Sequence, residues 1–206
     1  MQDHIDTKVP VITEAEMDIT SPVDETMLQA VPAYLEPDQM AALLYTSGTT
    51  GLPKGVMLSS KNILTNCIQT LARFGLVTEE RVFGVLPFFH SFAQNICVWQ
   101  TLLAGCTVII VPRIERRHIL EGLIHKPTVF VGIPALFGLM CLLKNADLSS
   151  VKYFASGGDA LPDRIRCGFE LIYQRKIGAG YGLSETSPVL TADLEDINTC
   201  WYLIID

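Results

Sequence analysis

The residues with the clearest chemical potential lie in one stretch, Tyr45–Gly55, which combines glycine, hydroxyl side chains and a lysine. Three glycines let the backbone turn sharply and present its N–H groups, four Ser and Thr hydroxyls add donors, and Lys54 adds a positive charge. Such a set of donors suits the oxygens of a polyphosphate. The stretch is not a Walker A loop, because Pro53 precedes the lysine and Gly55 follows it. A flexible surface turn is the alternative interpretation.

Three later segments also have an unusual composition, and the last two of them carry residues suited to a nucleotide. Tyr181 offers a flat face on which a purine can stack, and Gly157 and Gly158 allow backbone to approach a ligand closely. Glu185 is a hard oxygen ligand of the kind that holds Mg²⁺ beside phosphates, although taken alone it would be a solvated loop carboxylate. The segments are Leu86–Phe92, Ala155–Pro162 and Tyr181–Pro188.

Short apolar runs alternate with segments of helical periodicity from residue 41 onward. After a first apolar run at 41–45, the pattern predicts strands at 82–86, 107–111, 128–131, 152–155 and 176–179. Helices are predicted at 62–74, 92–103, 116–124, 135–144 and 162–173. Such a βαβ series predicts an α/β fold with a largely parallel sheet and helices on both faces.

The loops with unusual composition follow strands in this prediction. They are 46–55, 87–92, 156–161 and 180–188. Because ligands bind at the carboxyl ends of parallel strands, the pattern predicts that these four loops share one site.

These four segments, in this order, resemble the motifs of the adenylate-forming superfamily, which includes acyl-CoA synthetases, luciferases and nonribosomal adenylation domains. The resemblance covers about residues 38–190. It implies that the chain is part of the large N-terminal AMP-binding domain of such an enzyme. Leu86–Phe92 looks most like the corresponding segment of fatty acyl-CoA ligases and acyl-carrier-protein synthetases, including those fused to lysophospholipid acyltransferases.

The resemblance assigns roles to residues that the chemistry alone leaves open. It implies that Lys54 and Glu185 are catalytic, and that His90, which would otherwise be read as a structural histidine, lies beside the acyl carboxylate and the thiol entry path. The implied phosphate loop is Thr46, Ser47, Gly48, Thr49, Thr50, Gly51 and Lys54, and the implied Mg²⁺ ligands are Glu185 and Thr46. The implied adenine-binding residues are Gly157, Gly158, Asp159, Tyr181, Gly182 and Ser184.

The implied reaction is the ATP-dependent activation of a carboxylic acid, most typically a fatty acid, to an acyl-adenylate. The acyl group then passes to a thiol, on CoA or on the phosphopantetheine of an acyl carrier protein. ATP and Mg²⁺ are the implied cofactors. An amino-acid adenylation domain is the alternative within the superfamily, and a non-catalytic nucleotide-binding or scaffold remnant is the alternative outside it.

Charge divides the chain into segments. The 206 residues carry a net charge of −7, and nine acidic side chains against one lysine fall within residues 1–40. We therefore expect residues 1–36 to form an acidic arm or linker. The resemblance implies that 37–190 form a partial AMP-binding domain and that 191–206, which do not resemble the continuation of the superfamily, form a divergent tail. The hydrophobic share of 49% excludes a disordered chain, and the acidity argues against a nucleic-acid partner.

Comparison with the usual length of the superfamily predicts a truncated core that binds ATP weakly and turns over little or not at all. Exposed apolar surface then predicts self-association. No signal peptide is visible, and the longest uncharged stretch, Pro127–Leu143, is short of the roughly 20 residues of a membrane span. The expected location is cytoplasmic, with peripheral membrane contact of a longer protein left open. The six cysteines lie in apolar stretches without metal-site spacing and are expected to be buried thiols.

Overall fold

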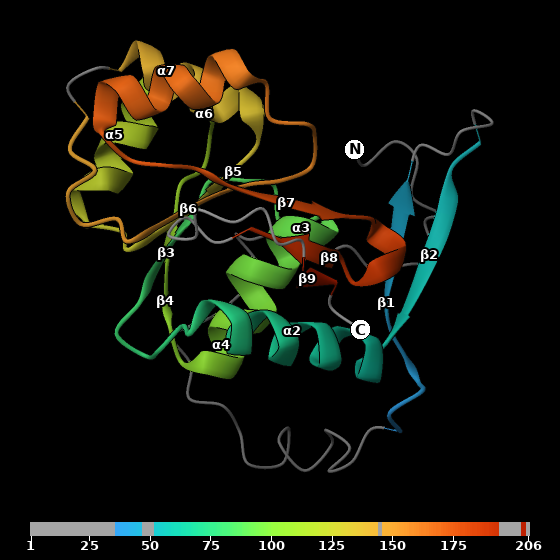
Figure 1. Cartoon of the computed structure of the whole chain (residues 1–206). Coiled ribbons are helices and arrows are strands. Elements are labelled where there is room, and N and C mark those ends of the chain that lie inside the picture. Colours follow the sequence, from blue (N-terminus) through green and yellow to red (C-terminus); the bar gives the residue numbers. More distant parts are fainter. Residues whose placement is uncertain (1–35, 47–51, 144–145, 194–202, 205–206) are drawn as a thin grey trace, which may run out of the picture. The chain divides into compact units, whose positions relative to one another are not determined.

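The computed structural model of the chain describes residues 36–46, 52–143, 146–193 and 203–204. Within them the main sheet has seven strands in the order β4-β3-β5-β6-β7-β8-β9 (Figure 1). The first five of these run parallel to one another, whereas β8 is antiparallel to β7, and β9 is antiparallel to β8. The strands are β3 (Arg81–Gly84), β4 (Thr107–Ile110), β5 (Val129–Gly132), β6 (Tyr153–Ser156), β7 (Gly178–Gly182), β8 (Val189–Ala192) and β9 (Leu203–Ile204).

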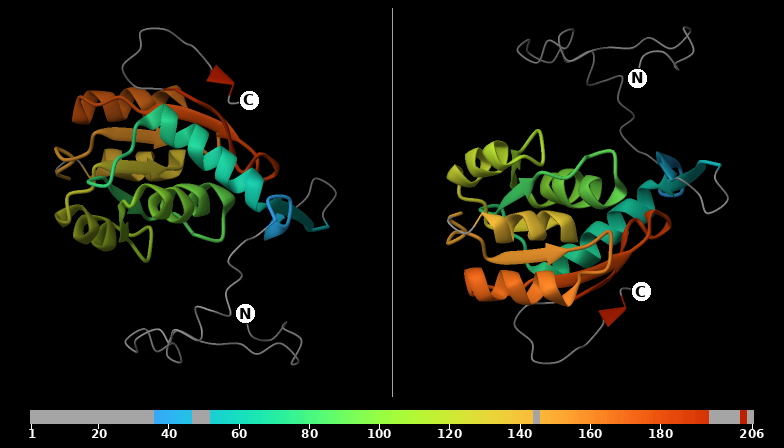
Figure 2. Two further views of the ribbon diagram at one scale, coloured as in Figure 1. Left: turned by 90° about the horizontal axis from the view of Figure 1, so that it is seen from below. Right: turned by 90° about the horizontal axis from the view of Figure 1, so that it is seen from above.

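Helices cover both faces of the main sheet, which confirms the predicted α/β class. Seen from below, one layer lies in front of the sheet, and seen from above the other does (Figure 2). The lower layer contains α2 (Ser60–Phe74), α3 (Ser91–Gln94), the π-helical turn η3 (Asn95–Trp99) and α4 (Gln100–Ala104). The upper layer contains α5 (Arg116–Ile124), α6 (Pro134–Leu142) and α7 (Asp163–Tyr173).

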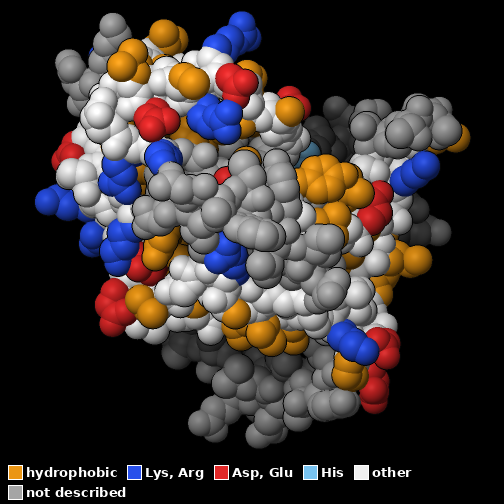
Figure 3. Space-filling view, viewed as in Figure 1, with side chains coloured by type: hydrophobic (Ala, Val, Ile, Leu, Met, Phe, Trp, Pro, Cys, Tyr) orange, Lys and Arg blue, Asp and Glu red, His pale blue; other side chains and the backbone are white. Residues whose placement is uncertain are grey.

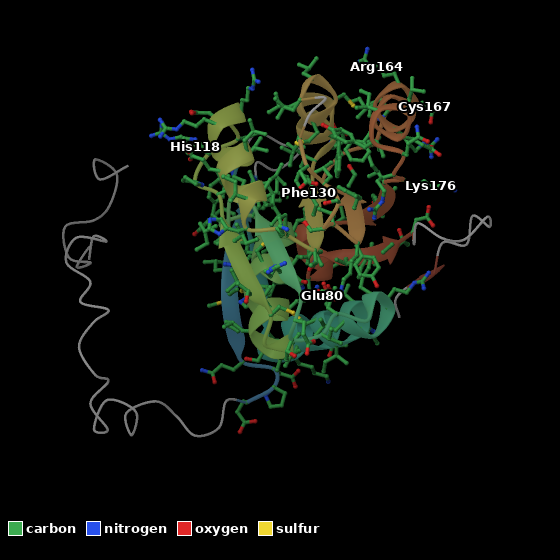
Figure 4. The ribbon with its side chains drawn as sticks, turned by 90° about the vertical axis from the view of Figure 1, so that its left-hand side faces the viewer. Glu80, His118, Phe130, Arg164, Cys167 and Lys176 are labelled. Atoms are coloured by element: carbon green, nitrogen blue, oxygen red, sulfur yellow. The ribbon has the colours of Figure 1, made fainter. Side chains whose placement is uncertain are left out.

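Side chains alternate between the two faces of the parallel strands, so each helix layer packs against an apolar face of the sheet. Phe83, Phe130 and Phe154 point from neighbouring strands toward the upper layer, and the rings of Phe83 and Phe130 stack with centroids 4.8 Å apart. Val82 and Val129, one residue earlier on their strands, point to the opposite face and pack against η3. Figure 4 shows Phe130 between the strands and the upper helices.

The first strand does not join the parallel sheet, which corrects the expected topology. β1 (Met40–Thr46) pairs antiparallel with β2 (Lys54–Ser59) in a separate two-stranded sheet. The inner face of this hairpin packs on α2, which begins at a Ser59 N-cap whose hydroxyl accepts a hydrogen bond from the Asn62 N–H. The loop at 46–55 therefore connects hairpin strands and does not follow a strand of the main sheet.

An ion pair fastens the amino ends of the parallel strands, opposite to the loops that carry the motifs. Lys152, just before β6, donates a hydrogen bond of 2.7 Å to Glu80, just before β3, whose side chain is only 4% exposed. Burial by itself raises the pKa of Glu80, but hydrogen bonds from Lys152 and Thr128 and the charges of Lys152 and Arg81 outweigh it. The pKa of this carboxyl therefore lies below its ordinary value.

The segments expected to be an arm and a tail fall largely outside the described residues. Residues 1–35 and 194–202 are among those not described, whereas the first two residues of the expected tail, 191–192, are the end of β8. No helix in the described ranges is both long and apolar enough to cross a membrane.

Candidate active site

Three of the four motif segments meet at the carboxyl edge of the parallel strands. The segment after β3 carries Ser91, whose hydroxyl lies 3.2 Å from that of Ser184 in the segment after β7. The same segment carries Phe92, whose ring packs against Gly157 at the end of β6, so closely that a Cβ on the glycine would lie 2.8 Å from the ring. The predicted convergence of these loops is therefore observed in direct contacts.

The fourth segment lies on the hairpin. Thr46 and Lys54 are opposite each other in the register of β1 and β2, and they bracket the loop between these strands. Lys54 is exposed, and Thr46 is half-buried. The rest of the expected phosphate loop (Ser47, Gly48, Thr49, Thr50 and Gly51) lies outside the described residues. Because β2 contacts the 3₁₀ turn η4 (Ser184–Thr186), the hairpin lies next to the element that carries Glu185.

The turn at the end of β7 presents Glu185 to solvent. The Leu183 N–H donates to the Pro188 carbonyl at 3.0 Å, and the Thr186 hydroxyl donates to the same carbonyl at 2.6 Å. These bonds close the segment into a tight loop, which leaves Glu185 exposed at its tip. Tyr181, two residues before Leu183, is 58% exposed, so one face of its ring is accessible to a ligand.

The other expected ligand-binding residues lie on the same edge. Gly158 has φ of +81°, a conformation that favours glycine and bends the chain away from β6. The neighbouring Asp159 is exposed, and its carboxylate accepts a hydrogen bond of 2.7 Å from the Ala160 N–H. His90 is exposed at the start of α3, with its ring centroid 4.8 Å from that of Phe89.

The thiols in the lower helix layer are poorly suited to covalent chemistry. Burial raises the pKa of Cys67 to about 11 and that of Cys97 to about 12, so both remain protonated at neutral pH. Burial was expected for all the cysteines, and among the described ones Cys67 and Cys97 confirm it. Cys106 and Cys141 are only half-buried, and Cys167 on the outer side of α7 is exposed (Figure 4), which corrects that expectation for three thiols.

The oxygen donors of Glu185 and Thr46 fit a magnesium ion that takes most of its other ligands from the phosphates of a bound nucleotide. A carboxylate from Glu185 and a hydroxyl from Thr46 are hard oxygen ligands. Glu185 lies on η4, which contacts β2, and β2 is the strand that pairs with the Thr46-bearing β1. In the part of the chain that the structure describes, no group of three or more His, Cys, Asp or Glu side chains gathers to hold a metal. This arrangement suits Mg²⁺, which is commonly bound by one or two protein oxygens together with phosphate oxygens.

The sequence interpretation missed the residues that fasten the Tyr181–Pro188 segment from below. Asn66 of α2 and Asn95 of η3 are buried and hydrogen-bond to the backbone of Val189 and Ser187. Each lies on the buried face of its helix, where asparagine is a poor helix former and where burial demands a polar partner. That mismatch is the signal from which they could have been found.

This geometry defines an α/β domain in which loops from the ends of the strands meet beside a hairpin that is rich in glycine and threonine. A profile of the family described as AMP-binding enzyme matches residues 2–201, and the chain belongs to this family. The long-chain-fatty-acid–CoA ligase of Bacillus subtilis is 39% identical over 176 residues, which is 82% of this chain and 31% of the ligase. The 4-coumarate–CoA ligase 3 of Arabidopsis thaliana is 33% identical over 200 residues, which is 90% of this chain and 34% of that enzyme.

Solved structures show the same architecture. The structure of ATP-bound MatB from Rhodopseudomonas palustris matches with a TM-score of 0.72 and 27% identity, over 80% of this chain and 33% of MatB. The chain therefore spans about a third of the length of the curated relatives and of this structure.

Proposed function

We propose that this chain binds ATP with Mg²⁺ and supplies the nucleotide side of a site that activates a carboxylic acid. The single observation that supports this most strongly is the contact of the three motif segments with one another, through Ser91 with Ser184 and Phe92 with Gly157. Together with the neighbouring hairpin, they bring a stacking ring, glycine backbone, a carboxylate and a lysine to one edge of the sheet.

In the proposed reaction, an acid carboxylate attacks the α-phosphate of ATP, and pyrophosphate leaves to give the acyl-adenylate. The Lys54 ammonium and the backbone N–H groups of the hairpin loop stabilise the negative charge that develops on the phosphates. Tyr181 stacks on the adenine, while Gly157 and Gly158 border it closely, alongside Asp159, Gly182 and Ser184. Glu185 and Thr46 would hold Mg²⁺, which supplies charge neutralisation at the phosphates when bound.

The second half-reaction is the displacement of AMP by a thiol. His90 is exposed at the start of α3, so it can border both the acyl carboxylate and the path of an incoming thiol. We propose CoA as the thiol because the named relatives are CoA ligases, and a fatty acid as the substrate because the long-chain ligase shares 39% identity. An acyl carrier protein as acceptor and an amino acid as substrate are the competing possibilities that the assay separates.

Calorimetric titration of the chain with ATP·Mg²⁺ tests the nucleotide site. The Lys54→Ala variant should weaken binding about tenfold, the effect of one lost charge-assisted hydrogen bond, and Glu185→Gln should weaken it only when Mg²⁺ is present. Lys61→Ala is the matched control, because Lys61 is an exposed lysine on the neighbouring helix α2. Equal effects of the two lysine variants would contradict the proposal.

Acid-dependent release of pyrophosphate tests the chemistry on the same protein, with palmitate, 4-coumarate, malonate and phenylalanine compared as acids. CoA and a carrier protein bearing phosphopantetheine are then compared as acceptors. A folded chain that binds no nucleotide would refute the proposal and favour a scaffold role. Nucleotide binding without turnover would support the predicted low activity of this chain, and binding of the four acids would then be compared in place of their turnover.

We also infer that the chain self-associates through the outer face of the hairpin. Leu43 of β1 and Met57 of β2 are partners across the hairpin, and they are 44% and 71% exposed. Tyr45, on the same face of β1, is 73% exposed, and Figure 3 shows hydrophobic side chains exposed over this region. Contiguous apolar side chains of this kind favour association in water.

A further inference from the structure

Four polar side chains are buried between α2 and the η3–α4 segment, and none of them belongs to the four motifs. Asn95, Gln100, Thr70 and Asn66 are only 0%, 1%, 1% and 6% exposed. Burying an amide or a hydroxyl costs free energy unless it is hydrogen-bonded. If these side chains served only to hold the helices together, apolar residues would make the interface more stable. We therefore expect that other buried polar groups need these side chains as hydrogen-bond partners.

The π-helical turn aligns this set. In η3 the Gln100 N–H bonds to the Asn95 carbonyl, five residues earlier, so Gln100 lies above Asn95 on the same face of the helix. The Gln100 amide donates to the Asn95 side-chain oxygen and, at 2.7 Å, to the Thr70 hydroxyl of α2. A regular α-helical turn would direct Gln100 well away from Asn95, because five residues exceed one turn by more than a third. The widened turn therefore connects Asn95 to α2.

The polar groups that require these partners belong to the backbone after η4. Asn95 donates to the Ser187 carbonyl at 2.8 Å. The Asn66 amide donates to the Val189 carbonyl at 2.7 Å and accepts from the Val189 N–H at 3.2 Å, as a neighbouring strand would. Asn95 also donates to Asn66 at 3.3 Å, which joins the two anchors.

One anchored residue adopts an uncommon conformation. Ser187 has φ of +69°, in the left-handed region that non-glycine residues rarely occupy, and it is 4% exposed. Such a conformation persists where the surroundings fix it, and here Asn95 holds its carbonyl from below. The chain can then turn back into β8 while Glu185, two residues earlier, stays at the exposed tip of the turn.

We propose that Asn66, Asn95 and Gln100 are positioning residues: through the π-helical turn they fix the Ser187–Val189 backbone and thereby set where Glu185 and Ser184 stand at the nucleotide site. The role of Glu185 rests on the proposed function, whereas the fixing of the backbone does not. None of the three amides touches the ligand in this proposal.

Hydrogen exchange of the ligand-free chain tests the fixing directly. In Asn95→Leu, which has a similar volume and no hydrogen-bonding group, exchange of the backbone amides in 183–192 should become about tenfold faster. Thr101→Val is the matched control, because within the described residues the hydrogen bonds of this buried hydroxyl go to the Cys97 and Val98 carbonyls of the preceding turn η3 and none goes to the segment 183–192. If both variants leave this segment as slow as in the wild type, or accelerate it equally, the proposal is overturned.

Thr70→Val covers the case in which Asn95→Leu does not fold. It removes only the far end of the network, and it should accelerate exchange of the same segment by a smaller factor, again beyond Thr101→Val. Unchanged exchange in Thr70→Val, with Asn95→Leu unfolded, would overturn the proposal.

Ligand binding then separates this proposal from the proposed function. In the Asn95 variant the Mg²⁺ concentration that supports half-maximal ATP binding should rise several-fold, while binding of AMP without metal should change less. If the wild type binds no nucleotide, the proposed function fails while the exchange result still decides whether the amides fix the loop. If the wild type binds and the Asn95 variant needs no more Mg²⁺, the positioning of Glu185 is refuted.

Discussion

A single methyl group at Gly182 should displace the turn that carries Glu185. A Cβ at this position would overlap the Pro188 carbonyl oxygen and would lie 2.8 Å from the carbonyl carbon and 3.2 Å from the Val189 Cα. All of these are backbone atoms, which cannot move aside by changing a rotamer. Since carbon atoms pack best at 3.5–4.0 Å, the β7–β8 junction must open by about 1 Å to accept alanine.

That opening has a structural cost and a functional cost. It separates the Leu183 N–H from the Pro188 carbonyl, now 3.0 Å apart, and so removes the bond that closes the turn. Overpacking together with one lost hydrogen bond predicts that Gly182→Ala is less stable by about 2–3 kcal/mol. A shift of about 1 Å in Tyr181 and Glu185 should reduce turnover by about 100-fold wherever turnover is measurable, and should weaken ATP·Mg²⁺ binding about tenfold.

Gly180→Ala is the matched control on the same strand. Its Cβ would lie 3.6 Å from the Thr191 carbonyl oxygen and 3.7 Å from that of Ser156, which are ordinary contacts. Urea unfolding and nucleotide titration of both variants should therefore separate them clearly, with Gly180→Ala close to the wild type in both. If Gly182→Ala binds nucleotide and unfolds as the wild type does, the close approach of these backbones does not position the site.

Three further outcomes follow from other parts of the molecule. The folded-state pKa of Glu80 is below its ordinary value, so the ionised carboxyl stabilises the fold at a pH above that ordinary value. This stabilisation is lost as the pH falls through the folded-state pKa. Urea unfolding between about pH 7 and pH 3 should show the loss in the wild type but not in Glu80→Gln. Phe130→Ala should lower the free energy of unfolding by about 3–5 kcal/mol, because the ring is fully buried and stacks on Phe83. Met57→Lys should shift the chain toward monomer in light scattering without changing nucleotide affinity; an unchanged association state would exclude the hairpin face as the contact.

The main sheet was predictable because each parallel strand is a short apolar run between helical segments. The pattern located the strand that contains Phe130 and the helix at 116–124 closely. A strand that is covered on both faces forms a continuous apolar run, which is distinct from the periodicity of a helix. It also predicted that the loops at 46–55, 87–92, 156–161 and 180–188 would share one site. The contacts of Ser91 with Ser184 and of Phe92 with Gly157 confirm that the last three meet.

The hairpin and the amide network were not predictable in the same way. Residues 54–59 alternate exposed and buried side chains, but Gly55 and the preceding proline and lysine concealed the strand within an expected loop. The inner face of the paired β1 and β2 packs on α2, a contact that no local pattern reveals. Likewise, the partners of Asn66 and Asn95 are backbone groups more than 90 residues away in the chain, and only the folded structure brings them together.

Burial distinguishes the side chains that are proposed to contact the ligand from the groups that fix the backbone beneath them. Lys54, Tyr181 and Glu185 are exposed, as they must be to meet a ligand, and exposed loop side chains have little packing to fix their positions. The Asn66 and Asn95 amides and the close approach at Gly182 act instead on buried backbone, where a displacement meets strong resistance. Accuracy at the site therefore depends on Asn66 and Asn95, which no motif contains, and on the close backbone approach at Gly182, which lies inside the Tyr181–Pro188 motif. Substitutions among them should alter metal dependence and affinity together, whereas substitution of Lys54 should alter affinity alone.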